Sequence, residues 1–319
     1  MSTTATATDH LGEASPFEHI GLLYRSEADY LAGTVPFVRT ALSSGGPVLV
    51  AVPSDNLDLL RAALGADARQ VDFADMATAG RNPGRILPGV LLDFADAHPG
   101  RRVSIIGEPV WPGRTGVEYP ACVTHEALIN AAFAGRDATI LCPYDARRLG
   151  TVTLSDAHRT HPLVEQRGAR HPSDAYTDPL ELAAEFNRPL PFPPSDAAVL
   201  DYAGQTALSE ARLFVTKQAE AAGVPEVRIA ELAVAVNELV ANTVEHTATG
   251  GRVAVWTEPD VFVCQVEDTG HLPNPLTGRL RPDITQPRGR GLVFVNHLCD
   301  LVRVHTRPGH TEFRLHFRL

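Results

Sequence analysis

Four polar residues recur on one face of an otherwise apolar segment between residues 226 and 246. Glu231, Glu238, Asn242 and Glu245 follow one another at intervals of 7, 4 and 3 positions, so an α-helix places them within a narrow arc. Side chains of these types accept protons and bind hard cations. A buried carboxylate without a partner is costly, so the stripe must face either water or a bound polar ligand. The helix alone leaves both readings open.

Three short glycine-containing motifs follow this segment: residues 268–270 (DTG), 289–292 (GRGL) and 309–311 (GHT). The first ends a strand pattern, where a carboxylate can accept a hydrogen bond from an exocyclic amine. The second opens a helical pattern over residues 291–302, and backbone N–H groups at a helix start can bind phosphate. Each motif alone is common in turns and caps. Their order, together with the polar stripe, is much more specific.

These four motifs resemble the ATP-binding site of the Bergerat fold, shared by gyrases, histidine kinases and the anti-sigma-factor serine kinases (the GHKL ATPases). The resemblance covers residues 200–319 and is greatest to the last group. Glu238-x-x-x-Asn242 matches the N box of that family, and the three later motifs match its three glycine boxes. The resemblance implies a C-terminal α/β two-layer sandwich that binds ATP and magnesium.

The resemblance also implies a role for each matched residue. Asn242 would give its side-chain oxygen to Mg²⁺, and Glu238, one helical turn earlier, would take the proton from the attacking hydroxyl. Asp268 would read the adenine amino group, and Arg290 is favoured for phosphate contact among the eight arginines after residue 270. The remaining residues expected to bind the nucleotide are Gly270, Gly289, Gly291, Leu292 and Thr311.

The anti-sigma resemblance implies a protein serine/threonine kinase in transcription regulation, with a sigma factor and a STAS-type antagonist as partners, that pairs with a second copy of itself. A sensor histidine kinase would need a phosphoacceptor histidine in a helix before the ATP domain. The helical segment 204–222 contains none, which disfavours that class. A nucleotide-binding regulatory module without efficient phosphotransfer also stays open, because "NEL" and "GHT" depart slightly from the commoner family pattern.

The first half of the chain alternates buried-strand patterns with helical ones. Residues 46–52, 102–108 and 138–145 are strand-like, whereas residues 30–45 and 56–65 are helical and end in glycine. This alternation predicts a largely parallel α/β sheet whose ligands bind at the carboxyl ends of the strands.

This region resembles the MEDS sensory domain, through residues 17–31, 105–113, 125–130 (HEALIN) and 141–145 (LCPYD). The resemblance implies a RecA-like α/β fold that senses a small organic ligand. The sequence has no GxxxxGK[ST] motif and its only lysine is Lys217, so we expect no second ATP hydrolase here. The residues expected to line the sensory pocket are His19, Tyr24, Glu108, Trp111, Tyr144 and Asp145.

Three further residues of this region raise the question of a metal or redox site. His19 and His161 could contact a ligand or a metal, but isolated histidines are more often structural. Cys142 lies in a buried strand and is expected to be an inert small apolar residue. The four cysteines of the chain form no CxxC or Cys/His motif, so the sequence predicts neither disulfides nor a zinc site.

Length and composition set the outline of the molecule. With 319 residues, 44% of them apolar, we expect a flexible tail (1–16), a sensory domain (17–180), a proline-rich linker (181–196) and an ATP-binding domain (197–319). A net charge of −10 argues against nucleic acid and anionic membranes as partners. No apolar run is long enough to span a bilayer, so we expect a soluble, cytoplasmic protein.

Overall fold

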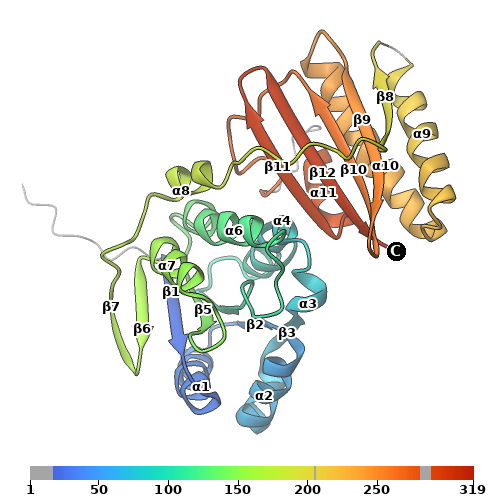
Figure 1. Cartoon of the computed structure of the whole chain (residues 1–319). Helices are drawn as coiled ribbons and strands as arrows, with labels where there is room; N and C mark the ends of the chain where they lie inside the picture. The colour runs from blue at the N-terminus through green and yellow to red at the C-terminus, as the bar shows by residue number, and fades with distance from the viewer. Residues whose placement is uncertain (1–16, 205, 281–288) are drawn as a thin grey trace, which may run out of the picture.

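The computed structural model describes residues 17–204, 206–280 and 289–319, which form two α/β units joined by an extended segment (Figure 1). The tail expected over residues 1–16 lies outside the described residues, as do Arg281 and Arg288. In the described part of the chain, no helix combines the length and the apolar composition that crossing a bilayer requires.

The N-terminal unit is built on a seven-stranded sheet with the order β3-β2-β4-β5-β1-β6-β7. All neighbouring strands are parallel except β6 and β7, which are antiparallel. The strands are β1 (Phe17–Tyr24), β2 (Val48–Val52), β3 (Asp72–Asp75), β4 (Val103–Gly107), β5 (Ala138–Asp145), β6 (Leu163–Gln166) and β7 (Ala169–Pro172).

Helices cover both faces of this sheet because its central strands are apolar on both sides. Every residue of β2 and β4 is buried, and apolar clusters lie on each face of the sheet. The covering elements are α1 (Glu27–Ser43), α2 (Ser54–Leu64), η1 (Gly65–Gln70), α3 (Met76–Ala79), α4 (Pro83–Ile86), η2 (Leu87–Leu91), α5 (Leu92–Asp96), α6 (Tyr119–Ala132), α7 (Thr151–Thr160) and α8 (Pro179–Glu185).

The C-terminal unit is a five-stranded antiparallel sheet with three helices on one face (Figure 1). Its strand order is β11-β12-β10-β9-β8, and apolar residues from alternate strand positions pack against the helices. The elements are β8 (Ala198–Tyr202), α9 (Ala207–Ala221), α10 (Glu226–His246), β9 (Gly251–Glu258), β10 (Val261–Asp268), α11 (Gly291–Leu298), β11 (Leu301–Arg307) and β12 (His310–Arg318). The predicted α/β class is thus confirmed for both units.

Two local expectations need correction. The helix expected over residues 291–302 ends at Leu298, and residues 301–307 form β11 instead, because Val302 and Val304 pair with β12 across the sheet. The segment between the units also begins later than residue 181, since α8 extends to Glu185.

The extended segment between the units crosses the sheet face that the helices leave open (Figure 1). Asn187 exchanges two hydrogen bonds with the backbone of Thr306, at 2.7 and 2.9 Å. The Leu190 N–H donates to Glu312 at 2.9 Å, and the Arg314 guanidinium donates to the Pro191 carbonyl. The proline-rich segment is therefore fixed against β11 and β12.

Candidate functional site

Helix α10 carries the four polar residues of the stripe, and their surroundings differ. Glu231 is paired with Arg228, and Glu245 is exposed near the end of the helix. Glu238 and Asn242 are half-buried, one helical turn apart. Neither of these two side chains has a hydrogen-bond or ion-pair partner in the part of the chain that the structure describes.

Asp268, at the end of β10, is held against α10 by a chain of hydrogen bonds. Its Oδ2 accepts from the Thr243 hydroxyl at 2.7 Å, and its Oδ1 accepts from the Gly270 N–H at 2.8 Å. The Tyr202 hydroxyl donates to Thr243 Oγ1 at 2.9 Å, and burial raises the pKa of Tyr202 to about 12. Because Thr243 directly follows Asn242, this chain of hydrogen bonds connects Asp268 to the part of α10 that carries Glu238 and Asn242.

Thr311 lies directly opposite Asp268 on the neighbouring strand β12. Residues paired in this way point to the same face, which here is the face covered by the helices. The Thr311 hydroxyl lies 2.8 Å from the Thr306 hydroxyl of β11, and Thr306 Oγ1 accepts from the Leu272 N–H at 2.9 Å. The chain after Gly270 therefore crosses the sheet edge toward β11.

The second glycine motif begins α11 directly beside Glu238. A β-carbon added to Gly291 would lie 2.5 Å from Glu238 Oε2, so no side chain fits there without displacement. Gly289 has a φ of 93°, a conformation that favours glycine. The N-terminal N–H groups of α11 and the Glu238 carboxylate thus meet at one place.

Arg303 and Arg314 lie side by side on neighbouring strands β11 and β12. The Arg314 guanidinium lies 4.9 Å from the Trp256 ring and donates to Gln265 at 2.6 Å, on the sheet face opposite the helices. Burial lowers the pKa of both Arg303 and Arg314. Arg290, the N-cap residue of α11, lies within the second glycine motif.

Three of the six residues expected in the sensory pocket gather at the carboxyl ends of β1, β4 and β5. Tyr24 pairs with Asp145 in register, and Glu108 directly follows β4. Burial raises the pKa of Glu108 to about 8, and the charge of Asp145 contributes to the shift. Asn56 of α2 donates to Glu108 at 2.8 Å. Sequence reasoning missed Asn56, although it follows the end of the neighbouring strand β2.

The structure places the other three residues apart from this group. His19 and Tyr144 are buried beside His161, with ring centroids 4.1 and 5.5 Å from that imidazole. Trp111 is half-buried under the Arg114 guanidinium, 3.8 Å from the ring. The predicted pocket therefore consists of two separate side-chain groups and one stacked tryptophan.

The loop that follows Gly270 also contacts the N-terminal unit. Leu276 packs against the apolar core that includes α6 residues, and a positive charge on Arg279 lies close enough to disfavour protonation of His125. Burial lowers the pKa of His125 to about 3 and that of Arg279 to about 10. Among the residues that the structure describes, neither His125 Nδ1 nor Arg279 Nη1 has a hydrogen-bond partner.

A second connection between the units runs through α4 and α11. Asn82 caps α4 and donates to the Asn296 carbonyl at 2.8 Å, while the Asn296 amide donates to the Gly278 carbonyl at 3.0 Å. Asp300 receives ion pairs from Arg81 of the first unit and Arg228 of the second. Sequence analysis gave no signal for this contact, because an N-cap asparagine has the same local pattern whether or not it touches another domain.

The two α/β units each match a known domain family. Residues 18–162 match the MEDS family (MEthanogen/methylotroph, DcmR Sensory domain), and residues 203–317 match the histidine kinase-like ATPase domain. The chain contains a MEDS sensory domain followed by a histidine kinase-like ATPase domain.

Other comparisons add little. No curated protein matches the chain. Among matching solved structures is the crystal structure of the RsbU and RsbW domains of Rv1364c from Mycobacterium tuberculosis, which is 22% identical with a TM-score of 0.31. That alignment covers 40% of this chain and 33% of the other, so the chain spans about a third of that relative.

Proposed function

We propose that this protein is an ATP-dependent serine/threonine kinase of the anti-sigma-factor type, and that its MEDS domain controls the kinase in response to a small organic ligand. The observation that carries the proposal is the junction of Glu238 with the start of α11. It places a half-buried carboxylate directly beside N–H groups that suit phosphate. A general base must lie beside the position of the transferred group, and the contact of Glu238 with Gly291 supports this role.

The remaining site residues suit ATP with magnesium. Mg²⁺ keeps several waters when it bridges phosphates and takes only one or two protein oxygens, which Asn242 can provide. When bound, Mg²⁺ would neutralise charge on the transferred phosphoryl group. Asp268, fixed by Thr243 and Gly270, would accept a hydrogen bond from the adenine amine. The N–H groups of residues 289–291 and the Arg290 guanidinium would hold the phosphates.

Two alternatives differ in the fate of the phosphoryl group. A sensor histidine kinase is disfavoured because α9, which precedes the N-box helix, contains no histidine. A nucleotide-binding regulator without phosphotransfer would not need a carboxylate beside α11, and Glu238 therefore favours the kinase. By resemblance to the anti-sigma kinases, the partners are a sigma factor, a STAS-type antagonist that carries the acceptor hydroxyl, and a second copy of this chain.

Regulation by the MEDS domain is supported by its contacts with the loop that follows Gly270. Leu276, Gly278 and Arg279 each interact with α6 of the sensory domain or with the chain of contacts that begins at Asn82. A ligand that shifts α4 or α6 would therefore move the segment that leads into the phosphate-binding turn.

The test compares Glu238→Gln with Glu245→Gln, an exposed carboxylate on the same helix. STAS-domain proteins from the source genome are the acceptors, ³²P transfer from ATP is the readout, and calorimetry with Mg-ATP measures binding. We expect Glu238→Gln to keep nucleotide binding and to lower transfer by about 10²–10⁴-fold, the usual contribution of a general base. Equal transfer by both variants would contradict the role of Glu238, and wild-type binding without transfer would favour the regulatory module.

A further inference from the structure

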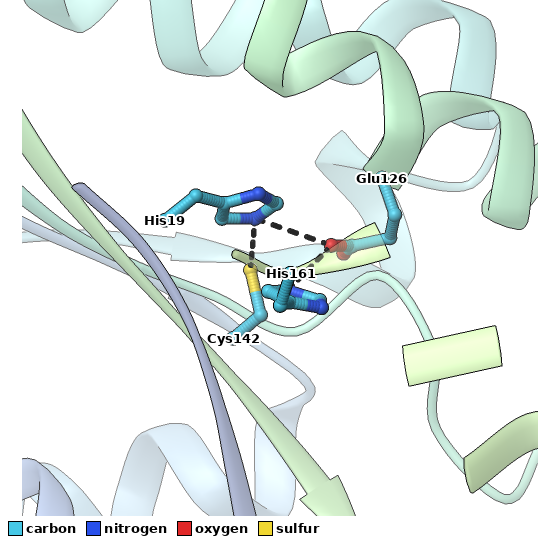
Figure 2. Close-up of side chains that lie close together, drawn as sticks. All are labelled: His19, Glu126, Cys142 and His161. Carbon is cyan, nitrogen blue, oxygen red and sulfur yellow. Dashed lines mark hydrogen bonds and ion pairs between the residues drawn. The ribbon is translucent and has the colours of Figure 1, made fainter. Parts of the chain in front are cut away.

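Four side chains that are distant in sequence meet in the core of the sensory domain (Figure 2). They are His19 from β1, Glu126 from α6, Cys142 from β5, and His161, which follows α7. All four are at most 1% exposed, and their potential ligand atoms lie within 4.8 Å of one another. His19 Nε2 is 3.4 Å from both Cys142 Sγ and Glu126 Oε2, and His161 Nε2 is 3.1 Å from Glu126 Oε2.

The surroundings of His19 determine where its proton lies. His19 Nδ1 is 3.1 Å from Asn130 Oδ1. The Asn130 amide nitrogen already donates to the carbonyls of Ala127 and Thr160, at 3.2 and 2.8 Å. Asn130 Oδ1 must therefore accept, and Nδ1 of His19 must donate. In the neutral imidazole this leaves Nε2 without a proton, facing Cys142 and Glu126.

His161 is oriented in the same way. Its Nδ1 is 2.8 Å from the Ala157 carbonyl, which can only accept, so Nδ1 carries the proton. Its Nε2 therefore also presents a lone pair to Glu126 when the ring is neutral. Metal-binding histidines are typically held like this, with the distal nitrogen donating to a carbonyl or an amide oxygen.

Without a cation, these groups face each other unfavourably. Among the described residues, both buried oxygens of Glu126 have no hydrogen-bond donor, and His161 Nε2 is likewise unsatisfied. A buried carboxyl group thus lies between two imidazole lone pairs and a thiol.

A tetrahedral metal ion resolves this arrangement. Bonds of 2.0–2.3 Å from zinc to nitrogen, oxygen and sulfur place neighbouring ligand atoms roughly 3.3–3.7 Å apart. The observed separations of 3.1 and 3.4 Å are close to that range. One carboxylate and one thiolate also balance the charge of a divalent ion. Imidazole and thiolate together suit zinc better than magnesium or calcium.

We propose that His19, Glu126, Cys142 and His161 bind a zinc ion that ties together β1, β5, α6 and the end of α7. Four protein ligands leave no open position, so the role is structural. Burial raises the pKa of the Cys142 thiol, but a coordinating metal deprotonates a thiol outright. One of the four residues, Glu126, lies on α6. This helix also carries His125, which lies near Arg279 of the ATP-binding unit.

In a second cluster, by contrast, the carboxylate has hydrogen-bond donors. His305, His310 and Glu312 also lie near one another. There, Glu312 accepts from the Leu190 N–H at 2.9 Å and from the Gln265 amide at 3.2 Å. That carboxylate has its donors without a metal, whereas Glu126 does not.

The test uses the purified full-length protein. Metal content is measured by mass spectrometry, the ion is removed with a chelator, and Co²⁺ is titrated in while the absorption spectrum is recorded. We expect saturation at one ion per chain, with intense visible bands of tetrahedral cobalt and a thiolate-to-cobalt band in the near ultraviolet. The thiolate band should be lost in Cys142→Ser and kept in Cys122→Ser, a buried thiol on α6 outside the cluster.

Asn130→Ala gives a measurement that does not remove a ligand. It should lower zinc affinity by about 10–100-fold, as expected when the partner of a ligating histidine is lost. The proposal is overturned if the wild type neither retains metal nor develops tetrahedral cobalt bands. It is also overturned if Cys142→Ser keeps the thiolate band. Neither result depends on kinase activity, so failure here would leave the proposed function untouched.

Discussion

Glu238 and Gly291 are in direct contact, so that the N-box helix and the start of α11 meet with no space for a β-carbon between them. The two residues are 53 positions apart in the chain. At position 291 a β-carbon would displace the Glu238 carboxylate, whereas Gly289 has a positive φ that favours glycine. The second glycine motif therefore serves two physical purposes, and only one of them concerns backbone conformation.

Replacing Gly291 with alanine should displace either the Glu238 carboxylate or the first turn of α11. A misplacement of about 1 Å can cost on the order of 10²-fold in rate. We expect phosphotransfer by Gly291→Ala to fall by that order, with a smaller loss of Mg-ATP affinity by calorimetry. Gly116→Ala is the control, because a β-carbon at Gly116 meets nothing within 4 Å. Unchanged transfer in Gly291→Ala would show that this contact is not part of the catalytic geometry.

Thr243→Val keeps the side-chain shape but removes the hydroxyl between Tyr202 and Asp268. Asp268 would lose the donor that orients it, and the buried Tyr202 hydroxyl would lose its acceptor, at a cost of about 1–3 kcal/mol. We expect ATP affinity to fall by roughly tenfold or more in calorimetry. Thr257→Val on an exposed position of β9 should bind ATP like the wild type. Equal ATP affinities of the two variants would show that the orientation of Asp268 does not affect nucleotide binding.

The sequence predicts the α/β class of both units because the relevant signals are local. Residues 138–145 form β5 over the expected range, and the helical pattern at 56–65 corresponds to α2. The glycine motifs could be aligned with a family because each one is a short continuous stretch. The error at the end of α11 is also local: "LVFV" is apolar, "LVRV" is apolar except for Arg303, and pairing with β12 decides between helix and strand.

Contacts between distant residues could not be predicted in this way. The ligand atoms of the proposed zinc site come from positions 19, 126, 142 and 161, with no repeated spacing to mark them. His19 was expected to line a pocket with Tyr24, but the alternation of side chains along β1 sends odd and even positions to opposite faces. The Asn82 contact with Asn296 spans 214 positions and depends on how two finished domains pack.

Glu108 should make the stability of the protein depend on pH. Its folded-state pKa of about 8 lies above the ordinary glutamate value of 4.5, so between these values the folded chain holds a proton that the unfolded chain has lost. The resulting stability is fully present below pH 4.5 and is lost as the pH rises toward 8. The slope from one such group is at most about 1.4 kcal/mol per pH unit.

Glu108→Gln removes this titration, so its free energy of unfolding should fall less steeply than that of the wild type between about pH 5 and 8. Urea unfolding at several pH values measures the difference between the two slopes. Glu220→Gln, at an exposed position of α9, corrects for groups common to both proteins. Parallel curves for wild type and Glu108→Gln would contradict a raised pKa at Glu108.

The last prediction concerns communication between the domains, for which Asn82 is the most specific residue. Its side chain caps α4 and also donates to Asn296, whose amide holds the Gly278 carbonyl. The Ser26 hydroxyl caps α1 by accepting a hydrogen bond from the Asp29 N–H. Ser26 has no described hydrogen bond to the ATP-binding unit, and it therefore provides a matched control. Loss of either cap should cost about 1 kcal/mol of stability. Only Asn82→Ala should also leave buried groups of α11 unpaired, for a total of roughly 2–4 kcal/mol.

Amide hydrogen exchange distinguishes the two variants. In Asn82→Ala, exchange should accelerate at residues 276–280 and in α11, because the Asn296 bond to Gly278 loses its support, and Mg-ATP affinity should change with it. In Ser26→Ala, faster exchange should stay within α1 and its neighbours. If the 276–280 segment were equally protected in both variants, α4 would not hold the segment that precedes the second glycine motif. Under the proposed function, control of the ATP-binding domain would then have to pass through Leu276 and Arg279, which also contact the sensory domain.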